Sequence, residues 1–203
     1  MIEIDAGKCI RCLQCTAACS LGVIHAKEGA PYADNSKFCM RCFHCAAACP
    51  SGAVRIDGEE NILPDDSISF TEDYQVNLRR LILQRRSFRH FEDRDVPDEL
   101  IREVLETAGW MPSTKNEQPT RWLCVKDRIR IHSMMGQIID YVEQSGDSPE
   151  VKSEYGEGNN MVIGNSRCLL ITYSDGKYRN PYADAVIQTT AVQLLLESRG
   201  IAS

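Results

Sequence analysis

The spacing of apolar residues along this chain of 203 residues changes near residue 73. Residues 57–73 are acidic, contain a proline and have little periodic apolar pattern, which is typical of a linker. From Tyr74 onward, apolar residues recur at helical spacing until a basic cluster begins at Arg85. The pattern therefore predicts that the second part of the chain begins with a helix.

The clearest amphipathic helix is predicted over residues 97–109. Pro97 occupies its first position, acidic residues follow in the first turn, and Gly109 ends the apolar stripe. Residues 111–120, MPSTKNEQPT, form a turn-rich loop. The other elements predicted after this helix are a strand at 122–125, a helix at 128–144 and a strand at 168–173.

The last predicted helix, residues 182–199, is apolar on nearly every side. Such a helix is expected to be central and buried, and Gly200 is its natural C-cap. Only three residues follow Gly200. We therefore expect further strands or a partner subunit to cover this helix.

Charge and composition exclude several classes of protein. The formal net charge of -6 argues against nucleic acid and acidic membranes as partners, since both need a basic surface. The sequence has no apolar run of about 18 residues, so we expect no membrane-spanning helix. Its first residues also lack the features of a signal peptide. We therefore expect a cytoplasmic protein, where clustered cysteines are metal ligands more often than disulfides.

The ten cysteines are distributed unevenly. Eight lie between Cys9 and Cys49, while Cys124 and Cys168 lie on predicted strands, where we expect them to be buried. The eight form two units of spacing C-x2-C-x2-C-x3-C, repeated at an offset of 30 residues. Three cysteines at this spacing ligate one cubane, and the fourth ligates the other cluster in two-cluster proteins. Structural zinc, which usually joins two separated pairs, and disulfides are the weaker alternatives.

The spacing assigns the eight cysteines to two [4Fe–4S] clusters. The first set is Cys9, Cys12, Cys15 and Cys49, and the second is Cys39, Cys42, Cys45 and Cys19. On these motifs, residues 1–57 resemble the bacterial two-cluster ferredoxins. The second unit keeps the usual proline after its last cysteine, Pro50, whereas the first unit has Ser20. A module of this kind transfers single electrons and has no substrate chemistry of its own.

A basic segment, Arg85-Arg86-Ser87-Phe88-Arg89, ends the helix that begins near Tyr74. Its guanidinium groups and hydroxyl are suited to holding a phosphate. On these residues alone, a solvated basic helix end, where cations favour the helix dipole, is an equal alternative.

Together with the sequence A-G-W-M-P-S-T-K-N-E-Q-P at 108–119, the basic segment resembles the FMN-dependent nitroreductase family, over about residues 74–203. The resemblance implies phosphate and ribityl contacts from Arg85, Ser87 and Arg89 with the Arg86 backbone. It implies ring contacts from Pro112, Ser113 and Asn116, in a loop that Gln118-Pro119 fixes. Asp184, which opens the last helix, also fits the family. One departure is Thr120, since the family usually has tryptophan after this proline.

We therefore predict an α+β protein with a two-cluster ferredoxin-like domain at residues 1–57, a linker at 58–73 and a nitroreductase-like α/β sandwich at 74–203. In the family, a segment after the central helix runs beside the flavin, and a tail embraces the partner subunit. The resemblance therefore implies a homodimer, and we expect the sandwich to appear truncated, with its C-terminal part absent.

The expected function is that of a flavin-dependent oxidoreductase that relays electrons through two [4Fe–4S] clusters and FMN. The donor would be NAD(P)H or a reduced ferredoxin, and the family resemblance implies a nitroaromatic, quinone-like or other conjugated acceptor. We name no catalytic residue, because the family often needs no side-chain acid or base. The alternative is an electron-transfer or interaction module whose flavin domain is incomplete and not catalytic.

Overall fold

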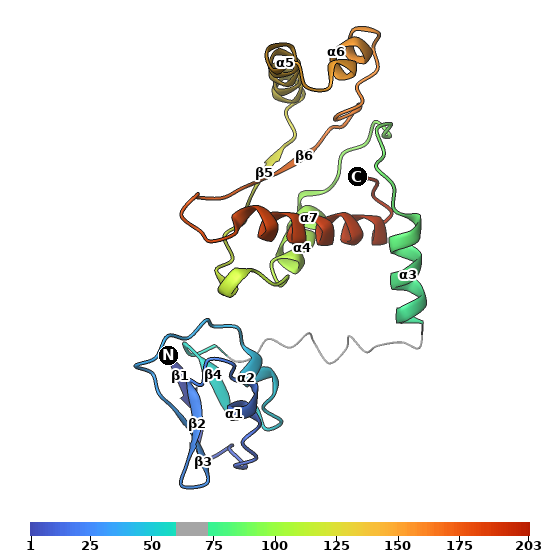
Figure 1. Cartoon of the computed structure of the whole chain (residues 1–203). Helices are drawn as coiled ribbons and strands as arrows, with labels where there is room; N and C mark the ends of the chain where they lie inside the picture. Colours follow the sequence, from blue (N-terminus) through green and yellow to red (C-terminus); the bar gives the residue numbers. More distant parts are fainter. Residues whose placement is uncertain (60–72) are drawn as a thin grey trace. The chain divides into compact units, whose positions relative to one another are not determined.

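The computed structural model describes residues 1–59 and 73–203, which belong to two compact units, Met1–Glu72 and Asp73–Ser203. We refer to them as the N-terminal unit and the C-terminal unit (Figure 1). The predicted linker at residues 58–73 lies almost entirely outside the described residues.

The N-terminal unit consists of short strands and two short helices. In chain order these are β1 (Ile2–Ile4), α1 (Gln14–Ala18), β2 (Ile24–Lys27), β3 (Ala30–Ala33), α2 (His44–Ala47) and β4 (Val54–Ile56). β1 pairs antiparallel with β4, and β2 pairs antiparallel with β3. Glu28 and Gly29 connect β2 to β3 with φ angles of 52° and 74°, as a two-residue hairpin turn of type I′ requires.

The sequence repeat of the N-terminal unit is also a repeat of backbone conformation. Three pairs of residues 30 apart share a left-handed φ: Arg11 and Arg41 (57° and 53°), Leu13 and Phe43 (61° and 59°), Gly22 and Gly52 (61° and 60°). Four of these six are not glycine, and left-handed φ is uncommon outside glycine. The two cysteine motifs therefore follow the same strained path.

The core of the N-terminal unit is small and includes cysteines. Its buried members are Ile2, Cys15, Val23, Ile24, Cys45, Ala46, Val54 and Ile56. Each cysteine motif contributes its third cysteine to this core. The predicted cluster ligation and the packing thus involve the same side chains.

The C-terminal unit consists mainly of helices around one two-stranded sheet (Figure 1). Its elements are α3 (Tyr74–Gln84), α4 (Asp98–Ala108), the 3-10 helix η1 (Thr114–Asn116), β5 (Arg121–Val125), α5 (Arg128–Ser145), α6 (Pro149–Gly156), β6 (Leu169–Tyr173) and α7 (Pro181–Ser198). β5 pairs antiparallel with β6, in a register that places Leu123 opposite Ile171.

Most of the predicted helices and strands of this unit are confirmed, with two differences. Pro97 is the residue before α4, with ψ 141°, and not its first helical residue. The sequence reasoning also missed α6, which begins at Pro149 and has no buried residue. An amphipathic stripe could not identify α6, because α6 has no strongly apolar face.

The helix α7 packs against α4 and forms the core of the unit with it. The buried positions of α7 recur every four residues, at Asp184, Gln188, Val192 and Leu196. Within this chain α7 is not covered on every side, because Tyr182 is 82% exposed and Val186 48% exposed. These faces agree with the expectation that further strands or a partner subunit cover this helix. In residues 1–59 and 73–203, no helix has both the length and the apolar content to cross a bilayer.

Candidate functional site

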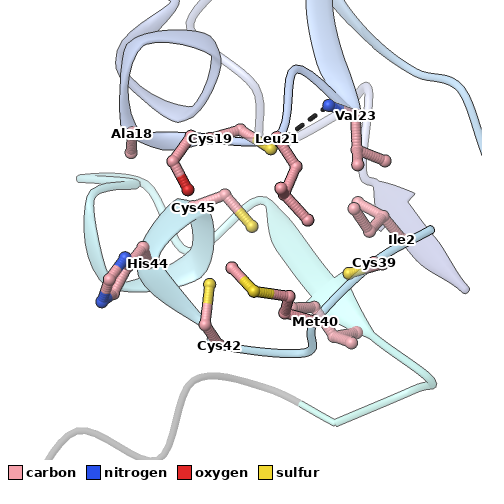
Figure 2. A pocket seen from close by; sticks show the side chains of 12 residues that line it. Ile2, Ala18, Cys19, Leu21, Val23, Cys39, Met40, Cys42, His44 and Cys45 are labelled. Carbon is pink, nitrogen blue, oxygen red and sulfur yellow. Dashed lines mark hydrogen bonds between the residues drawn. The ribbon is translucent and has the colours of Figure 1, made fainter. Parts of the chain in front are cut away.

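Four of the predicted ligands surround one pocket in the N-terminal unit (Figure 2). Cys19, from the first motif, lies there with Cys39, Cys42 and Cys45 of the second motif. The space among these side chains is about 340 Å³ when the adjoining solvent is included. This cysteine pocket contains the interlocked set that the spacing predicts.

The charged groups that influence Cys15 show that members of the other predicted set also lie near one another. Burial raises the pKa of the Cys15 thiol, and the neighbouring Cys49 and Cys9 raise it further. Its equivalent in the repeat, Cys45, is raised to a pKa of about 11 by burial, with contributions from Cys19, Cys42 and Cys39. The structure therefore brings each third cysteine close to the fourth cysteine of the other motif.

Backbone N–H groups hold the two fourth cysteines. The Val23 N–H donates to Cys19 Sγ at 3.3 Å, and the Ala53 N–H donates to Cys49 Sγ at 3.2 Å. Burial opposes the charged form of both thiols, but several hydrogen bonds from residues 21–24 and 51–54 outweigh it and lower both pKa values. Donors of this kind stabilise a thiolate, which is the form that binds iron.

The donor set fits an iron–sulfur cluster better than a single ion. Within the described parts of the chain, no three His, Cys, Asp or Glu side chains converge closely enough to hold one metal ion. A cubane places each thiolate on a different iron, so its ligands need not converge on one point. Four thiols around a pocket, with N–H donors on Cys19 and Cys39, have that arrangement.

In the C-terminal unit, Gln118 holds the loop of residues 111–120, which we call the Gln118 loop. Its backbone N–H donates to Ser113 Oγ at 3.0 Å, and its side-chain amide donates to the Asn116 carboxamide at 3.1 Å and to the Met111 carbonyl at 3.3 Å. Gln188 of α7 donates to Gln118 Oε1 at 3.3 Å. These bonds agree with the role expected for Gln118.

Asp184, in the first turn of α7, anchors the same loop. The Thr114 N–H donates to Asp184 Oδ1 at 2.9 Å, and the Thr114 hydroxyl donates to the same oxygen at 3.2 Å. Asp184 is only 2% exposed, and its Oδ2 atom has no hydrogen-bond partner among the described residues. Burying a carboxylate costs folding free energy unless hydrogen bonds compensate for the lost water. The two bonds from Thr114 supply this compensation, so the carboxylate ties the Gln118 loop to α7.

The backbone of the Gln118 loop is strained. Lys115, Asn116 and Gln118 have φ angles of 53°, 56° and 47°. Each non-glycine residue with a left-handed φ costs on the order of 1–3 kcal/mol of folding free energy. Such residues cluster at functional sites. The hydrogen bonds to Gln118 and Asp184 offset this cost.

The side chains of the basic segment, residues 85–89, differ in whether they already make hydrogen bonds within the chain. The Arg86 guanidinium donates to the Leu83 and Arg85 carbonyls at 2.7 and 2.8 Å, so it caps the end of α3. The Arg89 guanidinium donates to the Met161 carbonyl at 3.1 Å and to the Phe88 carbonyl at 2.6 Å. Within the described residues, the Arg85 guanidinium and the Ser87 hydroxyl make no hydrogen bond. They are therefore available to an anion such as a phosphate.

Residues 164–165 fix the position of the basic segment. The Asn165 carboxamide exchanges two hydrogen bonds with the Phe91 backbone, at 2.7 and 2.9 Å. Gly164 has φ 58°, and a Cβ atom there would overlap the Arg89 carbonyl. Only glycine permits this close approach together with this φ.

The basic segment and the Gln118 loop lie at opposite ends of α7 (Figure 1). The Phe88 N–H donates to the Ser203 carbonyl beyond the C-terminal end of α7, whereas Thr114 binds Asp184 in its first turn. A helix rises about 1.5 Å per residue, so the 18 residues of α7 span about 27 Å. This length exceeds that of an FMN molecule. The structure therefore does not bring the two predicted sets of FMN contacts together within one chain.

The nitroreductase family model matches residues 82–203, and the 4Fe-4S dicluster domain matches residues 1–50. The chain belongs to the nitroreductase family. A nitroreductase with bound FMN from Desulfitobacterium hafniense DCB-2 superimposes with a TM-score of 0.55 and 25% identity, over 62% of this chain and 67% of that chain. The predicted nitroreductase-like α+β fold, with an N-terminal ferredoxin-type domain, is confirmed.

Two curated relatives match shorter parts of the chain. A protein of Archaeoglobus fulgidus, provisionally named NADH dehydrogenase/NAD(P)H nitroreductase, is 40% identical over 55 residues, which are 27% of this chain and 32% of its own length. The iodotyrosine deiodinase of Hydra vulgaris is 29% identical over 80 residues, 39% of this chain and 28% of its own. The match thus spans about a third of the length of these relatives.

Sequence reasoning missed or misjudged several residues of this nitroreductase-family unit. Gln188 was not singled out, because it lies within an apolar run, although its spacing of four from Asp184 places both on one face. Asn165 gave no signal, since its partner Phe91 is 74 residues away. The expectation that Cys124 is buried is wrong: Cys124 is exposed, although Trp122 and Leu170 on the same face of the sheet pack against the core of α4 and α7.

Proposed function

We propose that the protein is a flavin-dependent oxidoreductase that relays electrons through two [4Fe–4S] clusters and one FMN to a small conjugated acceptor, such as a nitroaromatic or a quinone. The cysteine pocket, in which Cys19 joins three cysteines of the other motif, is the observation that carries the electron-transfer part. The flavin part rests on membership of the nitroreductase family and on the bound FMN of the Desulfitobacterium relative.

The residues of the basic segment are suited to a phosphate. Arg85 and Arg89 supply guanidinium groups, which match phosphate geometry, and Ser87 adds a hydroxyl. The family resemblance assigns only the backbone of Arg86 to the site, and the Arg86 guanidinium caps α3. When bound, clusters exchange single electrons and a flavin exchanges one or two. The electron donor would be NAD(P)H or a reduced ferredoxin.

The Gln118 loop is suited to a flat ring. The Ser113 hydroxyl accepts the Gln118 N–H, so its own hydrogen can be donated to a ligand. The bond from Gln118 orients the Asn116 carboxamide, and Pro112 is an exposed, apolar neighbour. The hydrogen bonds hold this strained loop in one conformation before a ligand binds, which lowers the conformational entropy lost on binding.

We propose that the protein is a homodimer, in which one FMN takes the basic segment from one subunit and the Gln118 loop from the other. The separation of these groups along α7 supports this arrangement. So do exposed apolar side chains of α3 and α7, which association would bury: Val76, Leu78, Ile82, Leu83, Tyr182 and Val186. Sedimentation of the FMN-loaded protein tests it, and a flavin-containing monomer would contradict it.

Purification without oxygen, followed by iron, sulfide and flavin analysis, tests the function. We expect about eight irons and about one FMN per chain. Iron without flavin, even after FMN is added, would leave an electron-transfer module and contradict the enzyme. Flavin without iron would contradict the relay.

A further inference from the structure

Two cysteines of the C-terminal unit that no cluster motif includes lie side by side. Cys124 is in β5, Cys168 immediately precedes β6, and their sulfur atoms are 3.6 Å apart. Cys124 pairs with Leu170 across the sheet, so Cys168 occupies a diagonal position on the same face. Side chains in diagonal positions of an antiparallel pair are within reach of one another.

The two thiols differ in their access to solvent. Cys124 is exposed, whereas Cys168 is partly buried. Burial raises the pKa of Cys168 to about 12, and the adjacent Cys124 contributes. A small reagent therefore reaches Cys124 first, and Cys168 is protected as a neutral thiol beside it.

A cation accompanies the pair. The Lys126 ammonium donates to the Val96 carbonyl at 2.6 Å and pairs with Asp98. It also interacts electrostatically with both Cys124 and Cys168. A neighbouring cation favours the thiolate, which is the reactive form of cysteine.

We propose that Cys124 and Cys168 form a reversible redox pair, which converts between a dithiol and a disulfide by exchange with a small-molecule disulfide. The pair is separate from the electron relay proposed above and does not depend on it. To form the bond, the sulfurs must approach from 3.6 Å to about 2.05 Å. Diagonal Cα atoms are about 7–8 Å apart, so the bond requires side-chain rotation and a backbone shift. Cys168 lies just before β6, where the strand does not hold the backbone.

The exchange proceeds in two steps that balance. The Cys124 thiolate attacks one sulfur of the external disulfide, breaks its S–S bond and releases one thiolate, which leaves a mixed disulfide on Cys124. The Cys168 thiol loses its proton to the released thiolate and attacks the Cys124 sulfur, which releases the second thiolate. This thiolate takes up from solvent the proton that Cys124 lost before the first step. Both cysteines are oxidised, and the external disulfide is reduced to two thiols.

The new bond would join two segments that reach the candidate flavin site. β5 directly follows the Gln118 loop, and the segment before Cys168 contains Gly164 and Asn165, which hold the basic segment. A covalent bond between Cys124 and Cys168 would therefore restrict the relative movement of these two segments. We expect oxidation to change the rate of FMN release without changing the iron content.

Redox titration with peptide mapping tests the pair. The cofactor-loaded protein is equilibrated without oxygen in mixtures of reduced and oxidised glutathione, quenched with acid, alkylated and digested with trypsin. Cleavage after Arg121, Lys126, Arg167 and Lys177 gives peptides 122–126 and 168–177, each with one cysteine. We expect these two peptides to become cross-linked in a single transition that dithiothreitol reverses, in a chain that keeps its monomer mass under denaturing conditions.

Other results would overturn the pair. These are glutathione on Cys124 with no cross-link, no change in the most oxidising mixture, or a cross-link between two chains. As controls, Cys168→Ser should leave a stable glutathione adduct on Cys124, and Cys124→Ser should leave Cys168 largely unmodified. If circular dichroism shows that Cys168→Ser does not fold, Cys168→Ala takes its place.

Discussion

The two units of the molecule differ in how far apart in the sequence the residues that form their sites lie. In the N-terminal unit, a motif of eleven residues recurs after 30 residues with the same left-handed backbone positions. In the C-terminal unit, several bonds that fix the candidate site join residues 70 or more apart, as from Thr114 to Asp184 and from Phe91 to Asn165. Local spacing can therefore predict the first site in detail, but it predicts only the parts of the second.

The units also differ in how their cores relate to their sites. Cys15 and Cys45 belong to the core of the N-terminal unit, so the proposed clusters and the fold depend on each other. In the C-terminal unit, the apolar core of α4 and α7 lies apart from the polar residues that hold the Gln118 loop. Cofactor loss should therefore unfold the first unit and spare the second.

The largest effect is expected from Cys45→Ser. Cys45 is 6% exposed and lines the cysteine pocket, so the substitution removes a proposed ligand and a core side chain together. We expect iron to fall from about eight to no more than about four per chain, with loss of strand structure in the N-terminal unit, while FMN is retained. Iron analysis and circular dichroism measure this. Cys124→Ser is the control, and full iron in Cys45→Ser would show that the ligand assignment is wrong.

Gly164→Ala tests the long-range support of the basic segment. The added Cβ would overlap the Arg89 carbonyl, and φ 58° is itself unfavourable for alanine. We expect the C-terminal unit to lose about 2–5 kcal/mol of unfolding free energy in urea. Gly158→Ala is the matched control, because φ is 89° there but no atom lies within 4 Å. Equal losses for the two variants would argue against the close approach.

Arg89→Ala and Arg86→Ala separate a phosphate contact from a helix cap. Removing a charge-assisted hydrogen bond costs about 1.5–3 kcal/mol, so FMN should bind about 10–100-fold more weakly to Arg89→Ala. Arg86→Ala should bind FMN nearly as tightly as the unmodified protein, because its guanidinium caps α3. Fluorescence titration with FMN measures both affinities. A larger loss for Arg86→Ala would reverse the assignment.

Asp184→Ala should have the smallest effect of the four. It leaves the Thr114 N–H without its acceptor in a buried place, which costs about 1–3 kcal/mol of unfolding free energy. Because the Gln118 loop is also held by Gln188, FMN affinity should fall only a few-fold. Asp175→Ala is the control, since Asp175 is exposed and pairs only with Lys177 nearby. If Asp184→Ala had no more effect than Asp175→Ala, the anchor would be disproved.

The sequence predicted those features whose cause is local. The helices α4 and α5 follow from apolar periodicity, and the eight cysteines follow from spacing. It also predicted the residues of the Gln118 loop, but not that Asp184 and Gln188 hold it from α7. Those bonds depend on how α7 and the loop pack, which no local pattern specifies.

The burial of individual residues was the least predictable feature. The strand pattern predicted that Cys124 is buried, yet Cys124 is exposed. Apolar composition also could not indicate which faces of α7 this chain leaves uncovered, such as that of Tyr182. Burial depends on what packs over a face, and that is a property of the whole arrangement. The distance between Cys124 and Cys168 likewise follows from strand register, which the sequence did not indicate.

The buried stripe of α7 limits how this helix can change length. Its positions Asp184, Gln188, Val192 and Leu196 advance by four residues, whereas a turn contains 3.6, so the stripe winds by about 40° at each step. One inserted residue between Gln188 and Val192 would rotate the two ends by about 100° relative to each other. The loop and α4 could not then both keep their contacts. In an insertion scan, α7 should therefore reject residues added between Gln188 and Val192.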